Sequence, residues 1–389
     1  MKILHVSYYD IHGGAGIAAF RLCKEQREIG LDATMLVVEK FSDATWVKKI
    51  SAEKVKKMKF LQKIEALLSK LFANKKNFMP HSFNLFSLKT LEEILQQEPD
   101  IVHLHWINGQ MLSIREIAKL NMPVVWTLHD TWAYCGCEHH HLIDDKRFIS
   151  GYKGWGIEAF IWKKKFFQWK NFNPVIVGPS SWITSEAHHS ALFSRCRSEH
   201  IFNGIDFGQF KKISKNKARK YWHIPEDKKV IVAGAFSLDC KNKGGDLLWD
   251  VLANFLDAVI ILIGKTSVKN LPKNIIQTGL ITNQSVLSAA YSAGDVFLST
   301  AYYDNLPNML IESCCCGTPC VAIETGGVKD ILSFAGNGIA TSPEKDKLVD
   351  AIQFILDHST DFSPSAEAFD IKFLTLKYKD LYNEIIINC

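Results

Sequence analysis

Two segments in the second half of the chain carry side chains that could bind a phosphorylated ligand. In the first, Lys241 and Lys243 stand just before Gly244 and Gly245, downstream of an apolar run. A lysine beside glycines at the start of a helix suits a diphosphate, which brings negative charge and many acceptor oxygens. A solvated basic loop would show the same pattern, so this segment alone leaves both interpretations open.

The second segment runs from Asp304 to Glu312 and follows another apolar run. Pro307 suits the first turn of a helix, which would place the amides of Asn305 and Leu306 near the positive end of that helix. These amides could hold a sugar hydroxyl or a phosphate oxygen. Glu312 lies among apolar neighbours, and a buried carboxylate needs donors such as those of a ribose diol. A capping aspartate with a solvated glutamate fits the apolar surroundings less well.

The first half of the chain contributes two more candidates. A glycine-rich run, HGGAG at residues 12–16, follows the first apolar run. Glycines let the backbone approach a ligand and a helix start behind them favours an anion, although a plain tight turn is the alternative. His129 and Asp130 follow a buried run, where a histidine can donate a hydrogen bond to a ligand. A histidine satisfied within the core is the usual alternative.

All four segments follow apolar runs that alternate with amphipathic stretches. Such runs predict parallel strands buried on both faces, and two consecutive series predict two doubly wound sheets. Ligands of these sheets bind at the carboxyl ends of the strands, where the four segments lie. The expected strands are residues 2–8, 33–38, 101–105, 124–129 and 175–177, followed by 230–233, 258–263, 275–278, 296–300 and 320–323.

The predicted fold class is therefore α/β, with two Rossmann-like domains that face each other across a cleft. The length of 389 residues suits two domains. We expect a first domain at 1–177, a second at 178–368, and a helix within 369–389 that crosses back to the first. The first helix is expected at residues 17–29, ended by Gly30.

Composition excludes several classes of protein. The sequence has no run of the roughly 18–20 apolar residues that a membrane-spanning helix needs, and the N-terminal run meets Asp10 too early for a signal peptide. Three adjacent cysteines at residues 314–316 do not make a disulfide framework and are expected as small core residues. We therefore expect a cytoplasmic protein. Its net charge of +5 is too low to favour a nucleic acid as the partner.

The segment STAYYDNLPNMLIESCCCGTPCVAIETGGVKDIL resembles the signature of family-four glycosyltransferases, which are retaining enzymes with the GT-B fold. That signature has an acid, a glutamate eight positions later, then small-Gly-Thr-Pro, a strand and Gly-Gly. The supporting matches are FNGID at 202–206, GPSSW at 178–182, AGD at 293–295 and the glycine-rich run. The resemblance covers nearly the whole chain. The segment WTLHDTWAYCG further resembles the subgroup that assembles bacterial exopolysaccharides such as colanic acid.

The resemblance implies a donor-binding second domain and an acceptor-binding first domain. Asp304 would bind hydroxyls of the donor sugar, Glu312 the ribose, and Lys243 the leaving diphosphate, while His129 would face the transferred sugar. The implied catalytic residues are His129, Asp304 and Lys243. The implied donor-binding residues are Gly14, Ala15, Gly16, Lys241, Lys243, Asp304, Asn305, Leu306, Pro307 and Glu312, and the acceptor-side residues are Gly13, Asp130 and Asn203.

The function implied by the resemblance is transfer of a sugar, with retention of configuration, from a nucleotide-sugar to a lipid-linked or oligosaccharide acceptor of a surface polysaccharide. The family usually needs no metal and no other cofactor. Its favoured mechanism is attack on the face from which the diphosphate departs, with the leaving phosphate taking the proton of the acceptor. UDP is the expected nucleotide by its frequency in the family.

Two departures from the family pattern keep other functions open. The first acid is usually glutamate, whereas Asp304 is one methylene shorter. The family commonly has an arginine before the phosphate-binding lysine, but residues 232–237 contain none. Lys241 could substitute for it, although lysine lacks the bidentate fork of arginine. The alternatives are a nucleotide-sugar 2-epimerase of the same fold and a catalytically silent subunit that binds a sugar nucleotide.

A metal site and a membrane surface are further alternatives in the first domain. Cys135, Cys137 and His139–His141 are ligand types that suit zinc, but no second pair of ligands follows, so an ordinary loop near the active site is favoured. Residues 54–76 place apolar residues near helical spacing among lysines, and residues 160–170 interleave aromatic residues with lysines. Such segments can lie on an anionic membrane surface, which suits a lipid-linked acceptor at the inner face of the membrane. A surface helix packed on the sheet is the alternative for each.

Overall fold

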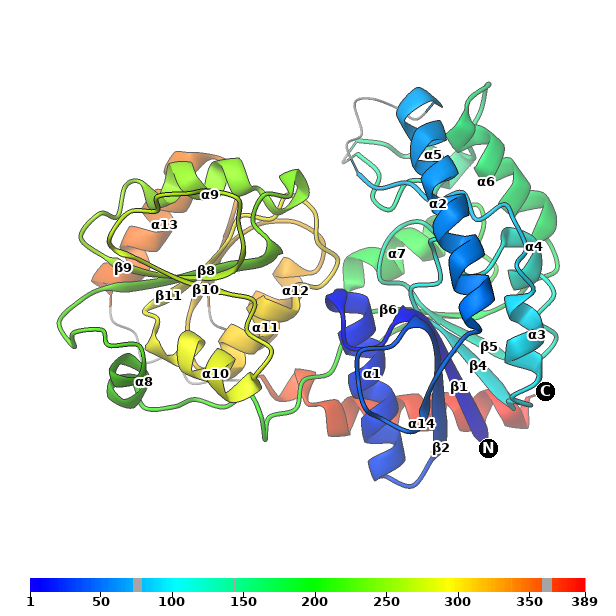
Figure 1. Cartoon of the computed structure of the whole chain (residues 1–389), viewed down its shortest axis with the longest axis horizontal. Coiled ribbons are helices and arrows are strands. Elements are labelled where there is room, and N and C mark those ends of the chain that lie inside the picture. The colour runs from blue at the N-terminus through cyan, green and yellow to red at the C-terminus, as the bar shows by residue number, and fades with distance from the viewer. Residues whose placement is uncertain (73–78, 143, 337, 359–365, 389) are drawn as a thin grey trace. The chain divides into compact units, whose positions relative to one another are not determined.

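In the computed structural model, the described residues form two α/β units and comprise everything except 73–78, 143, 337, 359–365 and 389. Unit 1 consists of Met1–Gly204 with Leu374–Cys389, and unit 2 consists of Ile205–Phe373 (Figure 1). Each unit is built on one sheet in which all paired strands are parallel. The predicted fold class of two parallel-sheet α/β domains is therefore confirmed.

Unit 1 contains a seven-stranded sheet in the order β3-β2-β1-β4-β5-β6-β7. Its strands are β1 (Lys2–Tyr9), β2 (Asp32–Glu39), β3 (Val47–Lys49), β4 (Ile101–Leu104), β5 (Val124–Thr127), β6 (Val175–Gly178) and β7 (Ser198–His200). Its helices are α1 (Gly13–Glu28), α2 (Ala52–Phe72), α3 (Thr90–Leu95), α4 (Ile114–Ile117), α5 (Arg147–Ser150), α6 (Ile157–Gln168), α7 (Ser181–His189) and most of α14 (Ile371–Ile387).

Unit 2 contains a six-stranded sheet in the order β10-β9-β8-β11-β12-β13. Its strands are β8 (Val230–Ser237), β9 (Val259–Lys265), β10 (Ile275–Gly279), β11 (Val296–Ser299), β12 (Cys320–Ile323) and β13 (Gly338–Thr341). Its helices are α8 (Lys215–Tyr221), η1 (Lys241–Lys243), α9 (Gly245–Leu252), α10 (Gln284–Ala293), α11 (Asn308–Cys315), α12 (Val328–Ala335), α13 (Lys345–Asp357) and η2 (Glu367–Phe369). Figure 1 shows α9 and α13 on one side of this sheet, and α10 and α11 on the other.

The strand order reverses once in each sheet. In unit 1 the chain moves outward from β1 to β3 and then returns to place β4 on the other side of β1. In unit 2 it moves from β8 to β10 and returns to place β11 beside β8. Loops that follow the two strands at a reversal turn to opposite faces, which leaves a crevice at the carboxyl edge where ligands bind. The loops after β1 and β4, and after β8 and β11, are therefore where a site is expected.

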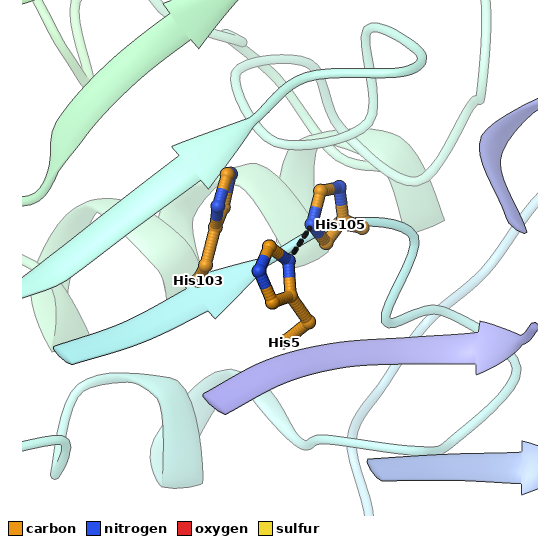
Figure 2. A group of neighbouring side chains, drawn as sticks. All are labelled: His5, His103 and His105. Carbon is orange, nitrogen blue, oxygen red and sulfur yellow. Dashed lines mark hydrogen bonds between the residues drawn. The ribbon is translucent and has the colours of Figure 1, made fainter. Parts of the chain in front are cut away.

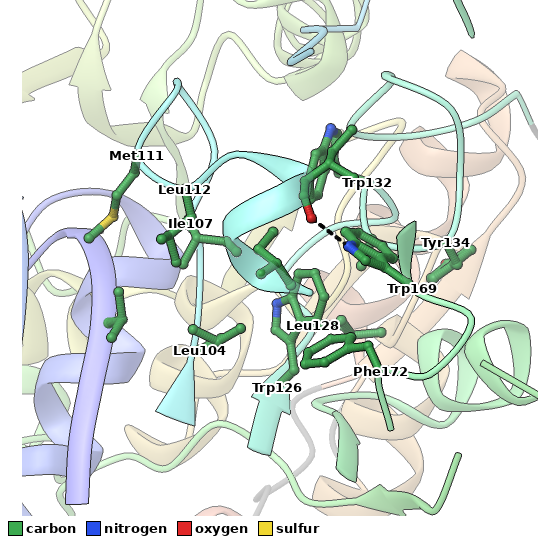
Figure 3. Packing of buried hydrophobic residues seen from close by; sticks show 14 of the residues in the cluster. Leu104, Ile107, Met111, Leu112, Trp126, Leu128, Trp132, Tyr134, Trp169 and Phe172 are labelled. Atoms are coloured by element: carbon green, nitrogen blue, oxygen red, sulfur yellow. Dashed lines mark hydrogen bonds between the residues drawn. The ribbon is translucent and has the colours of Figure 1, made fainter. Parts of the chain in front are cut away.

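An aromatic core supports the carboxyl ends of β4 and β5. Trp126 lies on β5, and Figure 3 shows it packed with Trp132, Trp169 and Phe172. The ring centroid of Trp169 lies 5.7 Å from that of Trp126 and 6.2 Å from that of Trp132. The indole nitrogen of Trp169 donates to the carbonyl of Ile114 at 2.9 Å, so this large ring is buried with its polar atom satisfied. The loop at residues 128–132 therefore rests on a rigid base.

The boundaries of the elements differ from the predicted ones at identifiable places. Strands β3, β7 and β13 were not predicted, because each spans three or four residues and none is an apolar run. The expected boundary at 177/178 coincides with the end of β6, while α7 and β7 still belong to unit 1 because β7 completes its sheet. Helix α1 begins at Gly13 instead of residue 17.

Among the described residues, no helix is both long enough and apolar enough to span a membrane.

Candidate active site

An ion pair bridges the strand reversal of unit 2. Lys243 lies in η1, which follows β8, and Asp304 follows β11. The ammonium of Lys243 donates to the carboxylate of Asp304 at 2.5 Å, and the two side chains are 28% and 23% exposed. Two residues predicted to contact one ligand thus lie side by side at the carboxyl edge of the sheet. Lys241, on the same short helix, is exposed.

The backbone around Lys243 is hydrogen-bonded to the segment that precedes Asp304. The hydroxyl of Thr300 donates to the carbonyls of Lys243 and Gly244 at 3.2 and 3.0 Å. The amide of Tyr302 donates to the carbonyl of Asn242 at 3.0 Å. Gly244 has a φ of +63°, and a Cβ there would lie 1.9 Å from the carbonyl oxygen of Thr300. Only glycine therefore permits this close contact between the two backbone segments, and the contact fixes the backbone position of the neighbouring Lys243.

The segment that begins at Asp304 is also held by the backbone at Gly326 and Gly327. The amide of Gly327 donates to the carbonyl of Asn305 at 2.6 Å, and a Cβ on Gly326 would lie 1.8 Å from the carbonyl of Asp304. Asn305 and Leu306 are buried. Pro307 is the N-cap of α11, one position before the first turn in which it was predicted. The amides at residues 305 and 306 consequently lie just before the helix.

Glu312 is a buried carboxylate inside α11, as expected from its apolar neighbours. It is 5% exposed, and the hydroxyl of the fully buried Tyr291 donates to its Oε2 at 3.0 Å. The hydrogen bond holds the carboxylate in place, and a carboxylate can accept several hydrogen bonds through its two oxygens. Contact of Glu312 with the hydroxyls of a ligand stays a prediction. Cys314 and Cys315 at the end of α11 and Cys316 at its C-cap are buried and free, which confirms them as core residues without disulfides.

At the strand reversal of unit 1, the glycine-rich run lies inside a helix. Gly13, Gly14, Ala15 and Gly16 form the first turn of α1, not a loop before it. A Cβ on Gly16 would lie 2.9 Å from the carbonyl oxygen of Asp10, so this glycine allows α1 to start against the end of β1. The N-terminus of α1, a helix of sixteen residues, therefore lies at the reversal, where it favours an anion.

His129 and Asp130 follow β5, next to the reversal. The Nε2 atom of His129 is hydrogen-bonded to Nδ1 of His105 at 3.1 Å. Burial lowers the pKa of His129 to about 4, while Asp130 acts in the opposite direction. His129 is therefore neutral at pH 7 and is hydrogen-bonded to a core histidine, while its contact with a ligand stays a prediction.

Asp130 holds three neighbouring groups together. Its carboxylate accepts hydrogen bonds from the indole of Trp106 at 2.8 Å, from His139 at 2.5 Å and from the amide of Trp132 at 3.0 Å. Burial acts to raise the pKa of Asp130, but the contact with His139 and the hydrogen bonds outweigh it and keep the pKa below its ordinary value. Asp130 is thus a charged organising centre of this loop. Asn203, the other predicted acceptor-side residue, follows edge strand β7.

Two of the histidine side chains at residues 135–141 have separate partners. His139 bonds Asp130 and Ser82, and His141 bonds Glu186 at 2.7 Å. Among the described residues, the one group of three with metal-ligand spacing consists of His5, His103 and His105 instead. The zinc alternative for residues 135–141 therefore gains no support from the geometry.

Sequence reasoning missed the polar groups beneath this loop. His5, His103 and His105 are buried. The hydroxyl of Tyr382, which lies on α14, is hydrogen-bonded to Nδ1 of His103 at 2.6 Å. The available signal was the alternation of histidines in otherwise apolar strands, HVSYY and VHLHW, which places polar side chains on one face of the sheet. Their partners, Gln26 and Tyr382, come from helices far away in the sequence and carry no such signal.

Profiles of two protein families match the sequence. The family described as Glycosyltransferase Family 4 matches residues 12–209, which is more than half of the chain. The family described as Glycosyl transferases group 1 matches residues 227–358. No curated protein matches the sequence.

Solved structures share the architecture at low sequence identity. Sucrose-phosphate synthase from Thermosynechococcus elongatus is 14% identical, with a TM-score of 0.68 and full coverage of both chains. HepE from Anabaena, in complex with UDP-glucose, is 16% identical with a TM-score of 0.66, covering 99% of this chain and 100% of the other. WaaG, a glycosyltransferase involved in lipopolysaccharide biosynthesis, is 14% identical with a TM-score of 0.61, covering 97% and 99%. These likenesses show the fold.

Replacing Gly244 by alanine is expected to disrupt the site. Gly336 serves as the control, because its φ of +60° is similar but a Cβ there meets nothing within 4 Å. Gly336→Ala should cost about 1 kcal/mol of unfolding free energy, from the left-handed backbone alone. Gly244→Ala should cost at least about 2 kcal/mol more, because its Cβ strikes a backbone carbonyl. Urea unfolding measures both, and equal costs would contradict the proposed close approach.

Proposed function

The chain belongs to glycosyltransferase family 4, and we propose that it transfers a sugar, with retention of configuration, from a nucleotide-sugar to a lipid-linked or oligosaccharide acceptor. Two parallel-sheet domains with the GT-B fold and the match of both family profiles support a glycosyltransferase. The observation that carries the proposal is the Lys243–Asp304 pair at the strand reversal of unit 2, with the buried carboxylate of Glu312 in the following helix.

The donor is proposed to bind unit 2 at this reversal. A diphosphate would compete with Asp304 for the ammonium of Lys243, which releases the carboxylate to accept hydroxyls of the sugar. Glu312 would accept from the ribose diol, held in place by the hydroxyl of Tyr291. UDP is the proposed nucleotide, and the structure of HepE, a protein of the same fold, contains UDP-glucose.

The chemistry proposed for these residues is electrostatic. A departing diphosphate gains negative charge as the sugar becomes cation-like, and fixed positive charge with aligned amides stabilises that charge separation. Lys243 supplies the charge, Lys241 is available beside it on η1, and the amides at residues 305 and 306 lie just before α11. The leaving phosphate would take the proton of the acceptor. With the charge supplied by lysines, the proposed reaction needs no metal and no other cofactor.

The acceptor is proposed to bind unit 1, near His129 and the start of α1. In this scheme the N-terminus of α1 attracts the negative charge of a lipid diphosphate or of the donor. A role in surface-polysaccharide assembly follows from the similarity of residues 126–136 to the exopolysaccharide subgroup. A silent sugar-nucleotide-binding subunit is the second candidate, because residues 232–237 lack the arginine that the family commonly uses.

We further propose that unit 1 contacts the anionic inner face of the cell membrane through α2 and α6. On α2, Phe60 and Leu67 are 63% and 59% exposed, and Lys63 and Lys70 are exposed beside them. Val55 and Met58 of the same stripe are buried in the core, so only part of the predicted apolar face is available. Residues 73–76 of the predicted segment lie outside the described residues.

Helix α6 divides its aromatic and basic residues between two faces. Phe160 and Phe167 are 53% and 68% exposed. Lys165, by contrast, is fully buried, with its ammonium 3.6 Å from the ring centroid of Trp132 and donating to the carbonyl of Gly136 at 2.7 Å. Lys165 therefore belongs to the core, which corrects its assignment to the membrane-binding surface. The exposed phenylalanines support the membrane proposal.

Removing either charge of the donor site should stop transfer while leaving the fold intact. Lys243→Ala and Glu312→Gln are each expected to lower turnover at least about 100-fold, since they remove charge aimed at the diphosphate and the ribose. Lys215→Ala is the control, because Lys215 also pairs with a carboxylate, that of Asp295 at 2.8 Å, but on α8. Release of nucleoside diphosphate measures turnover, and full activity in either donor-site variant would refute this placement.

Membrane contact predicts binding to anionic vesicles. The protein should sediment with phosphatidylglycerol vesicles at low salt, but not with phosphatidylcholine vesicles, and added salt should release it. Phe160→Ser combined with Phe167→Ser should weaken binding at least about tenfold, because both rings leave the interface. The control is Leu256→Ser with Phe354→Ser, which removes exposed apolar side chains of unit 2. Equal loss in both double variants would argue against α6 as the contact.

A further inference from the structure

Three buried histidines lie on one face of the first sheet, beneath the loop that carries His129. His5 of β1 and His103 of β4 are direct partners in the strand register, and His105 follows β4 (Figure 2). Their side chains are at most 3% exposed. Both ring nitrogens of each histidine have a hydrogen-bond partner. The three rings and His129 therefore form one continuous network, called here the histidine network.

One branch of the network runs from the core to His129. Gln26 of α1 meets Nε2 of His5 through its Oε1 at 2.8 Å. Nδ1 of His5 meets Nε2 of His105 at 2.9 Å, and Nδ1 of His105 meets Nε2 of His129 at 3.1 Å. Every contact between rings thus joins one Nδ1 to one Nε2, in the same order along the branch.

The amide of Gln26 gives this branch a direction. An amide oxygen only accepts, so His5 must donate from Nε2, and a neutral imidazole has a single proton. Nδ1 of His5 then accepts, which requires His105 to donate from Nε2 and accept at Nδ1. By the same step His129 donates from Nε2 and keeps an unprotonated Nδ1. Each ring has one tautomer that satisfies its neighbours, and the choice originates at Gln26.

The rings are held in the neutral state that this argument requires. Burial lowers the pKa of His5 to about 4, despite the opposing hydrogen bond to Gln26. Burial also lowers the pKa of His103 and of His105 well below the ordinary value. At neutral pH the network therefore contains no imidazolium, and a single proton on each ring has to be placed.

The second branch starts from the other end of the same amide. Nε2 of Gln26 donates to the hydroxyl of Tyr382 on α14 at 3.0 Å, and that hydroxyl meets Nδ1 of His103 at 2.6 Å. Nε2 of His103 then meets the hydroxyl of Thr127 at 2.7 Å. This branch is satisfied by the same orientation of Gln26: the hydroxyl of Tyr382 accepts from the amide, donates to Nδ1 of His103, and leaves Nε2 of His103 to donate to Thr127.

We propose that Gln26 acts as a positioning residue that fixes His129 as the Nε2-protonated neutral tautomer, so that His129 meets a sugar hydroxyl as a hydrogen-bond acceptor. The second clause rests on the proposed function, whereas the first concerns the unliganded protein. His129 follows β5 and is half-buried, and no described residue is hydrogen-bonded to its Nδ1. The assignment reverses the expectation that His129 donates a hydrogen bond to its ligand.

A metal ion is the competing occupant of this cluster. One ring nitrogen from each of His5, His103 and His105 lies within 4.8 Å of the others. A cation would have to break the 2.9 Å hydrogen bond between His5 and His105 and separate His103 from Tyr382 or Thr127. Because every nitrogen already has a protein partner, the geometry favours the hydrogen-bonded network.

The test is the tautomer of His129 in the purified 389-residue chain labelled with ¹⁵N-histidine, at pH 7 and without substrate. Two-bond ¹H–¹⁵N correlations identify which ring nitrogen carries the proton, and a His129→Gln variant assigns the signal. We expect the Nε2-protonated form. Gln26→Met, which has no amide, should convert His129 to a mixture of tautomers. Tyr378→Phe is the matched control, because the buried hydroxyl of Tyr378 on α14 meets Thr127 at 3.2 Å: it should lower the melting temperature through loss of a buried partner while leaving the tautomer of His129 unchanged.

The outcomes separate the alternatives. An Nδ1-protonated or doubly protonated His129 overturns the proposal, and so does an unchanged tautomer in folded Gln26→Met. An equal change in Tyr378→Phe would indicate a general packing effect and would also overturn it. Stoichiometric metal that EDTA removes, with shifts of the His5 and His105 signals, would establish the cation site instead. None of these results depends on donor binding, so failure of the proposed function would be seen separately.

Discussion

In a parallel sheet every loop that follows a strand lies at the same edge, and a reversal of strand order turns two neighbouring loops to opposite faces. Both units of this protein contain one such reversal, at β1/β4 and at β8/β11. The reversal determines where chemistry can occur, because it opens the carboxyl edge at that point alone. Lys243 and Asp304 occupy the two loops in unit 2, and the start of α1 occupies one loop in unit 1. The glycines at 244 and 326 serve this arrangement by letting backbones meet where a side chain would collide.

The first unit adds a second constraint, which is the need to satisfy polar groups buried beneath its loop. Leaving one such group without a partner costs about 1–3 kcal/mol. Tyr382 and Gln26 meet this need from two helices, α14 and α1, that are far apart in the sequence. The C-terminal helix is thus a component of the first unit, and its tyrosine anchors a network that reaches His129.

The sequence predicts the apolar strands well, because parallel strands buried on both faces are continuous apolar runs. It does not predict β3, β7 and β13, which are short edge strands with few apolar residues. In the proposed donor site it predicts the buried state of Glu312, from the neighbours of that residue. It does not predict the Lys243–Asp304 ion pair, because the partners are 61 positions apart and only the fold joins them. The histidine network escapes prediction for the same reason. Lys165 shows the opposite error, since a basic-aromatic pattern on a helix does not tell which lysine faces the core.

The central claim is that the strand reversal of unit 2 binds a nucleotide-sugar through Lys243, Asp304 and Glu312. The most direct test is a thermal-shift titration of the purified protein with UDP-, GDP-, dTDP- and CMP-sugars, with and without EDTA, in parallel with the Glu312→Gln variant. A ligand at 100 times its Kd stabilises the folded state by about 2.7 kcal/mol, which is readily detected. The account predicts that a UDP-sugar raises the melting temperature, that EDTA changes nothing, and that the variant does not respond. An absence of response to all four series, or an equal response in the variant, would contradict it.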